Sequence, residues 1–437
     1  MCFQHSEGPS AWFGFRSCEH RGAVASSQPD APVPGGARID PVSATPEPDP
    51  IVPYASPAAA GGPEHVEQAV AYDGLLLAGF GGPEGQDDVI PFLRNVTRGR
   101  GIPDERLGEV AHHYRHFGGI SPINSQNRAL KRAIEAELSR RKIDLPVYWG
   151  NRNWGPYLDE AVRAADAAGH HTLLALATSA YSSFSSCRQY REDFARVLEE
   201  TGLDGTVTID KIRQFFDHPG FVTPFVTGVR DAIAGFLADG IEPGEIRVLF
   251  STHSVPMDDA RRSGPRDREW GDGGAYESQH LAVAAYVMSE IVTDIPAAAD
   301  VPWQLVYQSR SGPPSQPWLE PDVCDVIAGL PAAGGRAVAI VPLGFVSDHI
   351  EVLWDLDTEA MEAAAEAGLA AVRTPTPGID PVYVAGLVDL IEERLHGTPA
   401  SDRPHVTNLG PWFDVCRPGC CENVRAGFKP AASGIAP

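Results

Sequence analysis

The segment Leu249-Phe-Ser-Thr-His253-Ser-Val-Pro256 places an imidazole where chemistry is possible. His253 follows an apolar run, between small hydroxyl residues and a rigid proline. Because the pKa of histidine lies near neutrality, such a residue can bind a borderline metal ion or accept a proton. A histidine at the end of a strand can equally be a packed structural residue. His253 by itself is therefore compatible with both readings.

A second segment, residues 344–357, is rich in carboxylates and also follows an apolar run. If a helix begins near Ser347, then Asp348, Glu351 and Asp355 lie on one face, with His349 among them. A row of this kind can relay protons or pass on a hard cation. The alternative is that acids near a helix N-terminus only complement its dipole. That alternative accounts for Asp348 but not for the whole row.

The cysteines form a third group of candidates. The chain has seven, and an odd number in a long chain argues against a framework of disulfides. Three of them, Cys416, Cys420 and Cys421, fall within six residues near the C-terminus. We interpret Cys324 as a small buried hydrophobic residue.

Composition limits the classes of function. A formal net charge of −23 disfavours nucleic-acid binding, which relies on basic patches that neutralise phosphates. No stretch of 18 or more uninterrupted apolar residues is present, which argues against stable insertion into a membrane. The first thirty residues lack the apolar core of a secretory signal, so the sequence predicts a cytoplasmic protein.

The elements that position these candidates follow from the apolar pattern. Residues 1–71 are rich in Pro, Ala and Gly without a helical or strand period, which predicts a disordered extension. Beyond it, short apolar runs predict strands, and amphipathic stretches between them predict helices. The predicted strands are residues 73–80, 146–151, 172–178, 206–210, 246–250, 303–307 and 337–341, and the predicted helices are residues 127–141, 157–168, 276–292, 358–367 and 381–395.

Strands that alternate with helices predict an α/β fold, with parallel sheets covered by helices on both faces. We expect two domains, residues 72–240 and 241–400, and a cysteine-containing tail, residues 401–437. In such sheets ligands bind beyond the carboxyl ends of the strands. His253 and the carboxylate segment both occupy that position.

Five segments resemble signature segments of the ferrochelatase family and occur in the family's order. They are Phe80-Gly-Gly-Pro83, Tyr114-Arg-His-Phe-Gly-Gly-Ile-Ser-Pro122, Ser251-Thr-His-Ser-Val-Pro-Met257, Tyr307-Gln-Ser-Arg310 with Pro317-Trp-Leu-Glu-Pro321, and Phe345-Val-Ser-Asp-His-Ile-Glu351. The resemblance covers residues 72–397. It implies two Rossmann-like domains with four-stranded parallel sheets, the chelatase fold, around a cleft for a porphyrin.

The resemblance also implies roles for individual residues. His253 and Glu351 would be the catalytic pair that receives Fe²⁺, the substrate metal, and removes the pyrrole protons. Asp348, His349 and Asp355 would support them. Porphyrin-binding positions implied in the same way are Phe80, Gly81, Gly82, Arg98, Arg100, Tyr114 and Ser121. Arg98 and Arg100 can also be solvated loop residues, and Tyr114 and Ser121 can be a packed aromatic and a turn hydroxyl.

Some members of the family, notably actinobacterial ones, carry a [2Fe–2S] cluster bound by one internal and three C-terminal cysteines. By resemblance these would be Cys187, Cys416, Cys420 and Cys421, and four thiolates are the usual complement. A zinc site made of the same residues is the alternative. The adjacent Cys420 and Cys421 do not suit the paired C-x2-C knuckles of most structural zinc sites, which favours the cluster.

The substrate is expected to be coproporphyrin III, giving coproheme in haem biosynthesis. The stretch that corresponds to the mouth of the cleft, residues 94–106, is polar and contains several arginines, which suits a porphyrin with four carboxylates. The alternatives are a ferrochelatase for protoporphyrin IX and a cobalt or nickel chelatase for another tetrapyrrole. From a different class, a non-catalytic haem-binding redox sensor is also considered.

Overall fold

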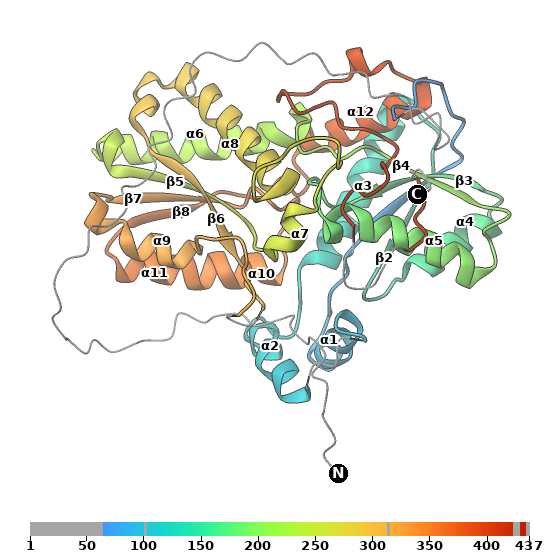
Figure 1. The fold of residues 1–437 in the computed structure, drawn as a ribbon, viewed down its shortest axis with the longest axis horizontal. Helices are drawn as coiled ribbons and strands as arrows, with labels where there is room; N and C mark the ends of the chain where they lie inside the picture. The colour runs from blue at the N-terminus through green and yellow to red at the C-terminus, as the bar shows by residue number, and fades with distance from the viewer. Residues whose placement is uncertain (1–63, 100–102, 313–314, 423–428, 434–437) are drawn as a thin grey trace.

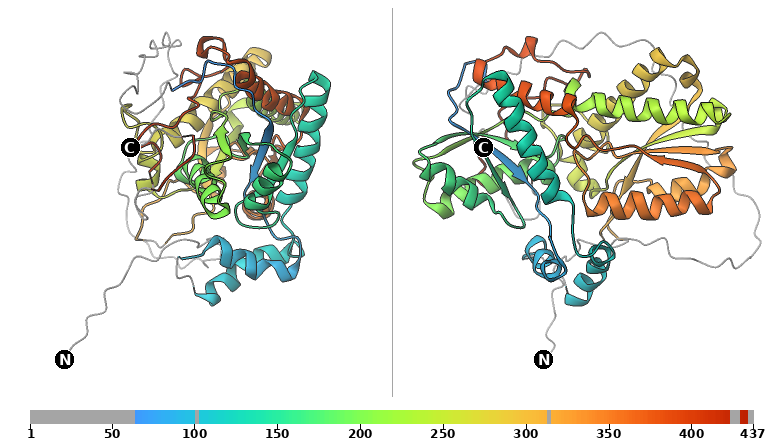
Figure 2. Two further views of the ribbon diagram at one scale, coloured as in Figure 1. Left: turned by 90° about the vertical axis from the view of Figure 1, so that its right-hand side faces the viewer. Right: turned by 180° about the vertical axis from the view of Figure 1, so that it is seen from behind.

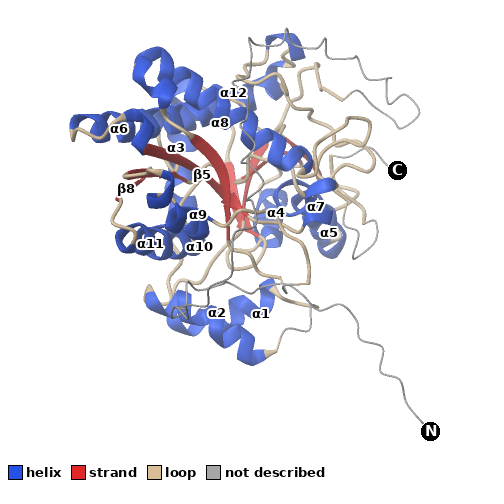
Figure 3. Ribbon diagram, turned by 60° about the vertical axis from the view of Figure 1, so that its left-hand side comes forward, coloured by secondary structure: helices blue, strands red, loops and turns tan. Residues whose placement is uncertain are grey.

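The computed structural model describes residues 64–99, 103–312, 315–422 and 429–433. Two four-stranded parallel sheets lie side by side, each covered by helices (Figures 1 and 3). The first sheet has the order β2-β1-β3-β4 and the second has the order β6-β5-β7-β8. The strands are β1 (Gly74–Gly79), β2 (Val147–Asn151), β3 (Thr172–Ala177), β4 (Thr208–Lys211), β5 (Ile246–His253), β6 (Trp303–Gln308), β7 (Ala337–Val341) and β8 (Ala370–Arg373).

The predicted α/β fold with two parallel four-stranded sheets is therefore confirmed. Every residue of β1 and of β7 is buried, as expected for strands covered on both faces. Strand β8 was missed by the apolar pattern. It is four residues long and lies at the edge of its sheet, where exposed and half-buried residues alternate.

The helices surround the two sheets, and α1 with α2 projects from one end as a separate cap (Figure 2). The α-helices are α1 (Val89–Val96), α2 (Asp104–His116), α3 (Ile123–Arg141), α4 (Leu158–Ala167), α5 (Gln189–Thr201), α6 (Pro219–Ala238), α7 (Met257–Arg261), α8 (Gly274–Asp294), α9 (Val323–Gly329), α10 (Ile350–Val352), α11 (Met361–Glu366) and α12 (Pro381–His396). Two π-helical segments, Phe184–Arg188 and Leu353–Ala360, precede α5 and α11.

The two halves share one core. A single cluster of buried apolar residues includes Leu75 of the first sheet and Val248 of the second. Helix α6 packs on β5, β7 and α8, while α12 packs against α6 and returns to α3 of the first half. The chain therefore crosses between the halves through α6 and α12. Because the halves are joined by packed helices, the site between them has a fixed frame.

Helix α6 is the one described helix that is long and apolar enough to cross a membrane by length and composition. In the structure it contacts α8, α12 and the second sheet, and Phe221, Val229 and Ile233 on it belong to the shared core. These contacts identify α6 as a core helix.

Part of the predicted N-terminal extension has defined contacts. Residues 1–63 lie outside the described residues, but Glu64 and Val66 contact the C-terminal tail, and the Val70 N–H donates to the Arg394 carbonyl of α12 at 3.2 Å. The Glu64 carboxylate forms a buried ion pair with Arg417. The Val66 N–H donates to Asp414 Oδ2 at 2.8 Å, and Arg403 donates to the Val66 carbonyl. Ordered chain therefore begins before Tyr72, because the tail provides partners for these residues.

Candidate active site

His253 and Glu351 face each other at one end of the second sheet. His253 is the last residue of β5, and Glu351 lies in α10, on the connection that follows β7. Since β5 and β7 are hydrogen-bonded neighbours, their carboxyl ends meet, and His253 Nε2 stands 3.7 Å from Glu351 Oε2. Both side chains remain about a quarter exposed, at 29 % and 22 %, to a cavity between the two halves. The pair can therefore act on a molecule in that cavity.

The hydrogen bonds of His253 determine which ring nitrogen is available. Nδ1 contacts the carbonyl oxygen of Ser254. A carbonyl can only accept, so Nδ1 carries the proton and donates it. When Nε2 carries no proton, its lone pair points toward Glu351 and the cavity. This tautomer suits a base or a metal ligand.

His349 lies near both residues of the pair. Its Nδ1 accepts a hydrogen bond from the Glu351 N–H at 3.3 Å and so caps α10. Burial lowers the pKa of His349, and the nearby Glu351 carboxylate acts in the opposite direction. A neutral His349 therefore fixes the backbone that carries Glu351.

Asp355 lies behind Glu351 and is buried. Its Oδ2 accepts hydrogen bonds from Gln308 Nε2 at 3.2 Å and from the Ser309 hydroxyl. Gln308 Nε2 also donates to the backbone carbonyl of Glu351. Burial raises the pKa of Asp355 well above its ordinary value, and the Glu351 carboxylate adds to the shift. Burial next to Glu351 thus favours the protonated form of Asp355, and the hydrogen bonds from Ser309 and Gln308 act in the opposite direction.

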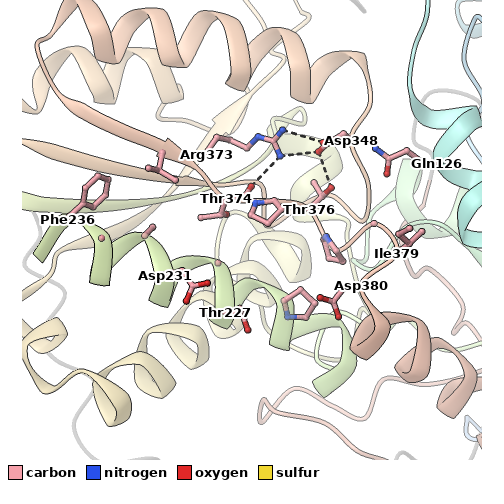
Figure 4. Close-up of a pocket in the computed structure, with 18 of the residues that line it drawn as sticks. Gln126, Thr227, Asp231, Phe236, Asp348, Arg373, Thr374, Thr376, Ile379 and Asp380 are labelled. Atoms are coloured by element: carbon pink, nitrogen blue, oxygen red, sulfur yellow. Dashed lines mark hydrogen bonds and ion pairs between the residues drawn. The ribbon is translucent and has the colours of Figure 1, made fainter. Parts of the chain in front are cut away.

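Asp348 does not join this row. The helix begins at Ile350 rather than near Ser347, and it continues as the π-helix Leu353–Ala360. Asp348 stays outside the helix and accepts hydrogen bonds from Arg373 at 3.2 and 3.3 Å and from Thr376 at 3.0 Å (Figure 4). It lines a different hollow of about 780 Å³, beside α6 and residues 372–380.

The first half supplies the opposite wall of the cavity, whose volume is about 260 Å³. Phe80 and Gly81 lie just after β1, and Tyr114 and Ser121 line the same space. Burial and the neighbouring Glu351 raise the pKa of Tyr114, so its phenol keeps its proton and remains a donor. Gly81 has φ +84°, and a Cβ there would stand 2.9 Å from Asn151 Cβ.

Two of the expected porphyrin-binding residues lie elsewhere, and a third lies outside the described residues. A Cβ on Gly82 would meet Ser121 and Ile123 at 2.8 Å, so this glycine permits close packing of the chain and does not line the cavity. Arg98 is exposed, donates to Asn95 Oδ1 at 2.6 Å and also does not line it. Arg100 lies outside the described residues.

The cavity also contains polar residues that the sequence analysis did not single out. Arg152 comes directly after β2, pairs with Asp193 at 2.7 Å and lies over the ring of Tyr190. Thr178 and Ser179 follow β3. Each of these stands at the carboxyl end of a strand, so the rule that located His253 would have found them had it been applied to every strand.

The four cysteines of the predicted cluster are all buried. Cys187 lies in the π-helix Phe184–Arg188, and the other three lie in the tail. The Sγ atoms of Cys420 and Cys421 are 3.8 Å apart. Burial raises the pKa of Cys187, while the nearby Lys211 and Arg191 act in the opposite direction. Within the described part of the chain, no group of three or more His, Cys, Asp or Glu side chains is arranged to hold a metal ion.

Comparison with known proteins agrees with this geometry. The model of the ferrochelatase family matches residues 72–395. A coproporphyrin III ferrochelatase of Leifsonia xyli is 66 % identical over 391 residues, which cover 88 % of this chain and 99 % of the relative. Proteins of the same name from Tropheryma whipplei and Streptomyces griseus are 58 % and 51 % identical, over 84 % and 83 % of this chain and 93 % and 96 % of the relatives.

Proposed function

The chain belongs to the ferrochelatase family, and on that premise we propose that it inserts Fe²⁺ into coproporphyrin III to form coproheme in haem biosynthesis. The observation that carries the proposal is the His253–Glu351 pair, 3.7 Å apart in a cavity between the two halves. The enzyme is a lyase whose substrates are the porphyrin and the ferrous ion. The identity to relatives named for coproporphyrin III supports this choice of porphyrin.

The wall of the cavity that carries His253 and Glu351 performs the chemistry of metal insertion. Insertion requires removal of two pyrrole protons and delivery of a divalent ion to the ring nitrogens. His253 Nε2, with its lone pair toward the cavity, accepts a pyrrole proton or receives the ion. The Glu351 carboxylate stabilises the charge that results and removes the second proton. Asp355 and His349 hold Glu351 in place through Gln308 and through the cap of α10.

The opposite wall binds the macrocycle. Phe80 offers an aromatic face, and Gly81 brings the backbone close to the ring without a side chain. Hydroxyl groups of Tyr114, Ser121 and Thr178 line the same space and can donate to propionate carboxylates. A wall with many hydroxyl donors suits a substrate with four carboxylates better than one with two.

The test is a metallation assay on purified protein with Fe²⁺ and either coproporphyrin III or protoporphyrin IX. We expect turnover with coproporphyrin III to exceed turnover with protoporphyrin IX, measured by the change in the absorption spectrum of the porphyrin. His253→Ala and Glu351→Gln should lose activity by about 10²-fold or more while binding of the porphyrin is retained. Turnover of protoporphyrin alone would refute the choice of porphyrin, and no turnover with either would refute the enzyme.

The same premise leads to a proposal for the cysteines: Cys187, Cys416, Cys420 and Cys421 bind a [2Fe–2S] cluster. Arg191 and Lys211 are almost fully buried beside these thiols; Arg191 interacts with Cys187, and the other hydrogen bonds of the two cations go to backbone carbonyls and the Gln214 amide. Buried cations require negative charge nearby, and thiolates around a cluster supply it. When bound, the cluster would supply redox chemistry, and the cysteines would tie the tail to the first half.

The absorption spectrum of freshly purified protein, with analysis of iron and acid-labile sulfide, tests the cluster. We expect a coloured protein that contains both, and a loss of both in Cys187→Ala. A colourless protein that contains zinc would show that the same thiols hold zinc instead. We also propose that the enzyme is cytoplasmic, as the sequence predicts; α6, the one described helix with the length and composition of a membrane span, packs in the core.

A further inference from the structure

The strand end that carries His253 is held by a tyrosine on another element. Tyr276 lies in the first turn of α8 and is buried. Its hydroxyl is 2.9 Å from the carbonyl oxygen of His253 and 2.7 Å from Thr252 Oγ1. Since the carbonyl can only accept, the phenol donates to His253 and accepts from Thr252. The two bonds fix the backbone from which the imidazole projects.

Tyr276 is in turn fixed by the loop after α7. The Tyr276 N–H donates to Ser263 Oγ at 2.8 Å, and Ser263 Oγ donates to the Ala260 carbonyl at 2.6 Å. Gly274, at the start of α8, has φ +65°, and a Cβ there would stand 1.8 Å from the Ala260 oxygen. The loop and the first turn of α8 are therefore pressed together, so that a shift of one moves the other.

The other side of this loop rests on a cysteine of the tail. The Cys421 N–H donates to the Arg262 carbonyl at 3.1 Å, and the Gly264 N–H donates to Cys421 Sγ at 3.2 Å. Gly264 has φ +81°, and a Cβ there would stand 2.4 Å from Ala275 Cβ, so the loop is packed tightly against α8 at this point. A path of hydrogen bonds joined by covalent segments thus runs from the sulfur of Cys421 through Gly264, Ser263 and Tyr276 to His253.

The internal cysteine reaches the same turn of α8 by a separate route. Ser182 and Gln279 exchange two hydrogen bonds between the halves: the Ser182 N–H donates to Gln279 Oε1 at 2.8 Å, and Gln279 Nε2 donates to Ser182 Oγ at 3.0 Å. The next residue, Ser183, caps the π-helix that contains Cys187. Gln279 stands one turn after Tyr276. Both parts of the cysteine set are therefore linked to the start of α8 through intervening residues.

We propose that Tyr276 is the positioning residue for His253, and that Cys421 holds the loop beneath Tyr276 through Gly264 and Ser263, so that a change at Cys421 alters the position of His253 and the rate of metal insertion. The path consists of hydrogen bonds between packed segments, which is the kind of connection that carries coupling between sites. The inference rests on the proposed function only for its activity readout, because the hydrogen bonds themselves hold whichever porphyrin is used.

The first experiment compares Tyr276→Phe with Tyr286→Phe, a tyrosine on the same helix whose hydroxyl pairs with Glu290 instead. Phenylalanine keeps the ring and removes only the hydroxyl. We expect kcat of Tyr276→Phe to fall about tenfold with the KM for porphyrin unchanged, because a small displacement of a reacting group is costly. Hydrogen exchange of residues 251–257, followed by mass spectrometry, should become faster in Tyr276→Phe and stay unchanged in Tyr286→Phe. Equal exchange and equal kcat in the two variants would overturn the role of Tyr276.

The second experiment compares Cys421→Ala with Cys324→Ala, a cysteine buried in the separate core around α9. Exchange of residues 251–257 and 274–280 should be faster in Cys421→Ala than in Cys324→Ala. Ser263→Ala breaks the middle of the path without touching a cysteine and should give the same pattern, which keeps the test valid if Cys421→Ala does not fold. Unchanged exchange at 251–257 in Ser263→Ala would overturn the path.

The two proposals fail separately. If the unsubstituted protein metallates no porphyrin but exchange at residues 251–257 still responds to Ser263→Ala, the proposed function is wrong and the path stands. If the unsubstituted protein turns over and Tyr276→Phe matches it in kcat and exchange, the path is wrong and the function stands.

Discussion

The substitution Asp348→Asn separates a structural carboxylate from a catalytic one. Asp348 and Glu351 are three residues apart, but the first faces Arg373 and the second faces His253. In Asp348→Asn the side chain keeps its shape and loses its charge. Asn retains one oxygen that can accept from Thr376, and Arg373 keeps Asp357, to which it donates at 2.6 and 2.8 Å. The arginine is therefore not left without a counter-charge.

The magnitude follows from the bonds that are lost. Hydrogen bonds to a charged group contribute about 1.5–3 kcal/mol each in a buried setting. Asp348 and Arg373 are partly exposed, and solvent screens their attraction, so we expect a net loss of about 1–2 kcal/mol in the free energy of unfolding. The kcat for metal insertion should stay within about twofold, because a substitution that leaves the reacting groups in place removes no interaction made in the transition state.

Urea unfolding and the metallation assay measure the two effects on the same preparations. The matched variant is Glu351→Gln, the same change of carboxylate to amide. It should keep the urea midpoint within error and lose about 10²-fold or more in kcat. If Asp348→Asn lost activity as strongly as Glu351→Gln at unchanged stability, the assignment of Asp348 to the Arg373 contact would be refuted.

Three further outcomes are expected. Glu393→Gln should lower the free energy of unfolding, measured in urea, by about 3 kcal/mol, because it weakens a buried ion pair with Arg213. Two nitrogens of Arg213 lie 2.9 and 3.0 Å from the Glu393 carboxylate oxygens. A loss below about 1 kcal/mol would contradict this. Burial lowers the pKa of His280 from 6.5 to about 3, so below pH 6.5 the unfolded chain binds a proton that the folded chain does not. The free energy of unfolding should therefore be highest above pH 6.5 and lower by about 2 kcal/mol at pH 5. His280→Phe should remove this part of the pH dependence. Gly81→Ala should lower the melting temperature and the affinity for porphyrin. A left-handed backbone costs a residue with a Cβ about 1–2 kcal/mol, and the alanine Cβ would stand 3.0 Å from the Trp154 nitrogen. An unchanged melting temperature would contradict the geometry of this turn.

The sequence by itself determined the fold class and the general location of the site. Seven apolar runs marked strands that the structure contains, because strands buried on both faces must be apolar throughout. His253 and the carboxylate segment were found because ligands of parallel sheets bind beyond the carboxyl ends of the strands. Residue type and local position were sufficient for these inferences.

The tertiary structure decided which side chains face one another. The carboxylates 348, 351 and 355 fit a regular helix in the sequence, but the chain enters the helix only at Ile350, and Arg373 on the unpredicted edge strand β8 draws Asp348 away. Tyr276 and Cys421 carry no local signal of a link to His253. Their connection depends on contacts between segments more than twenty residues apart, and such contacts arise only when the packing of the whole core sets each distance.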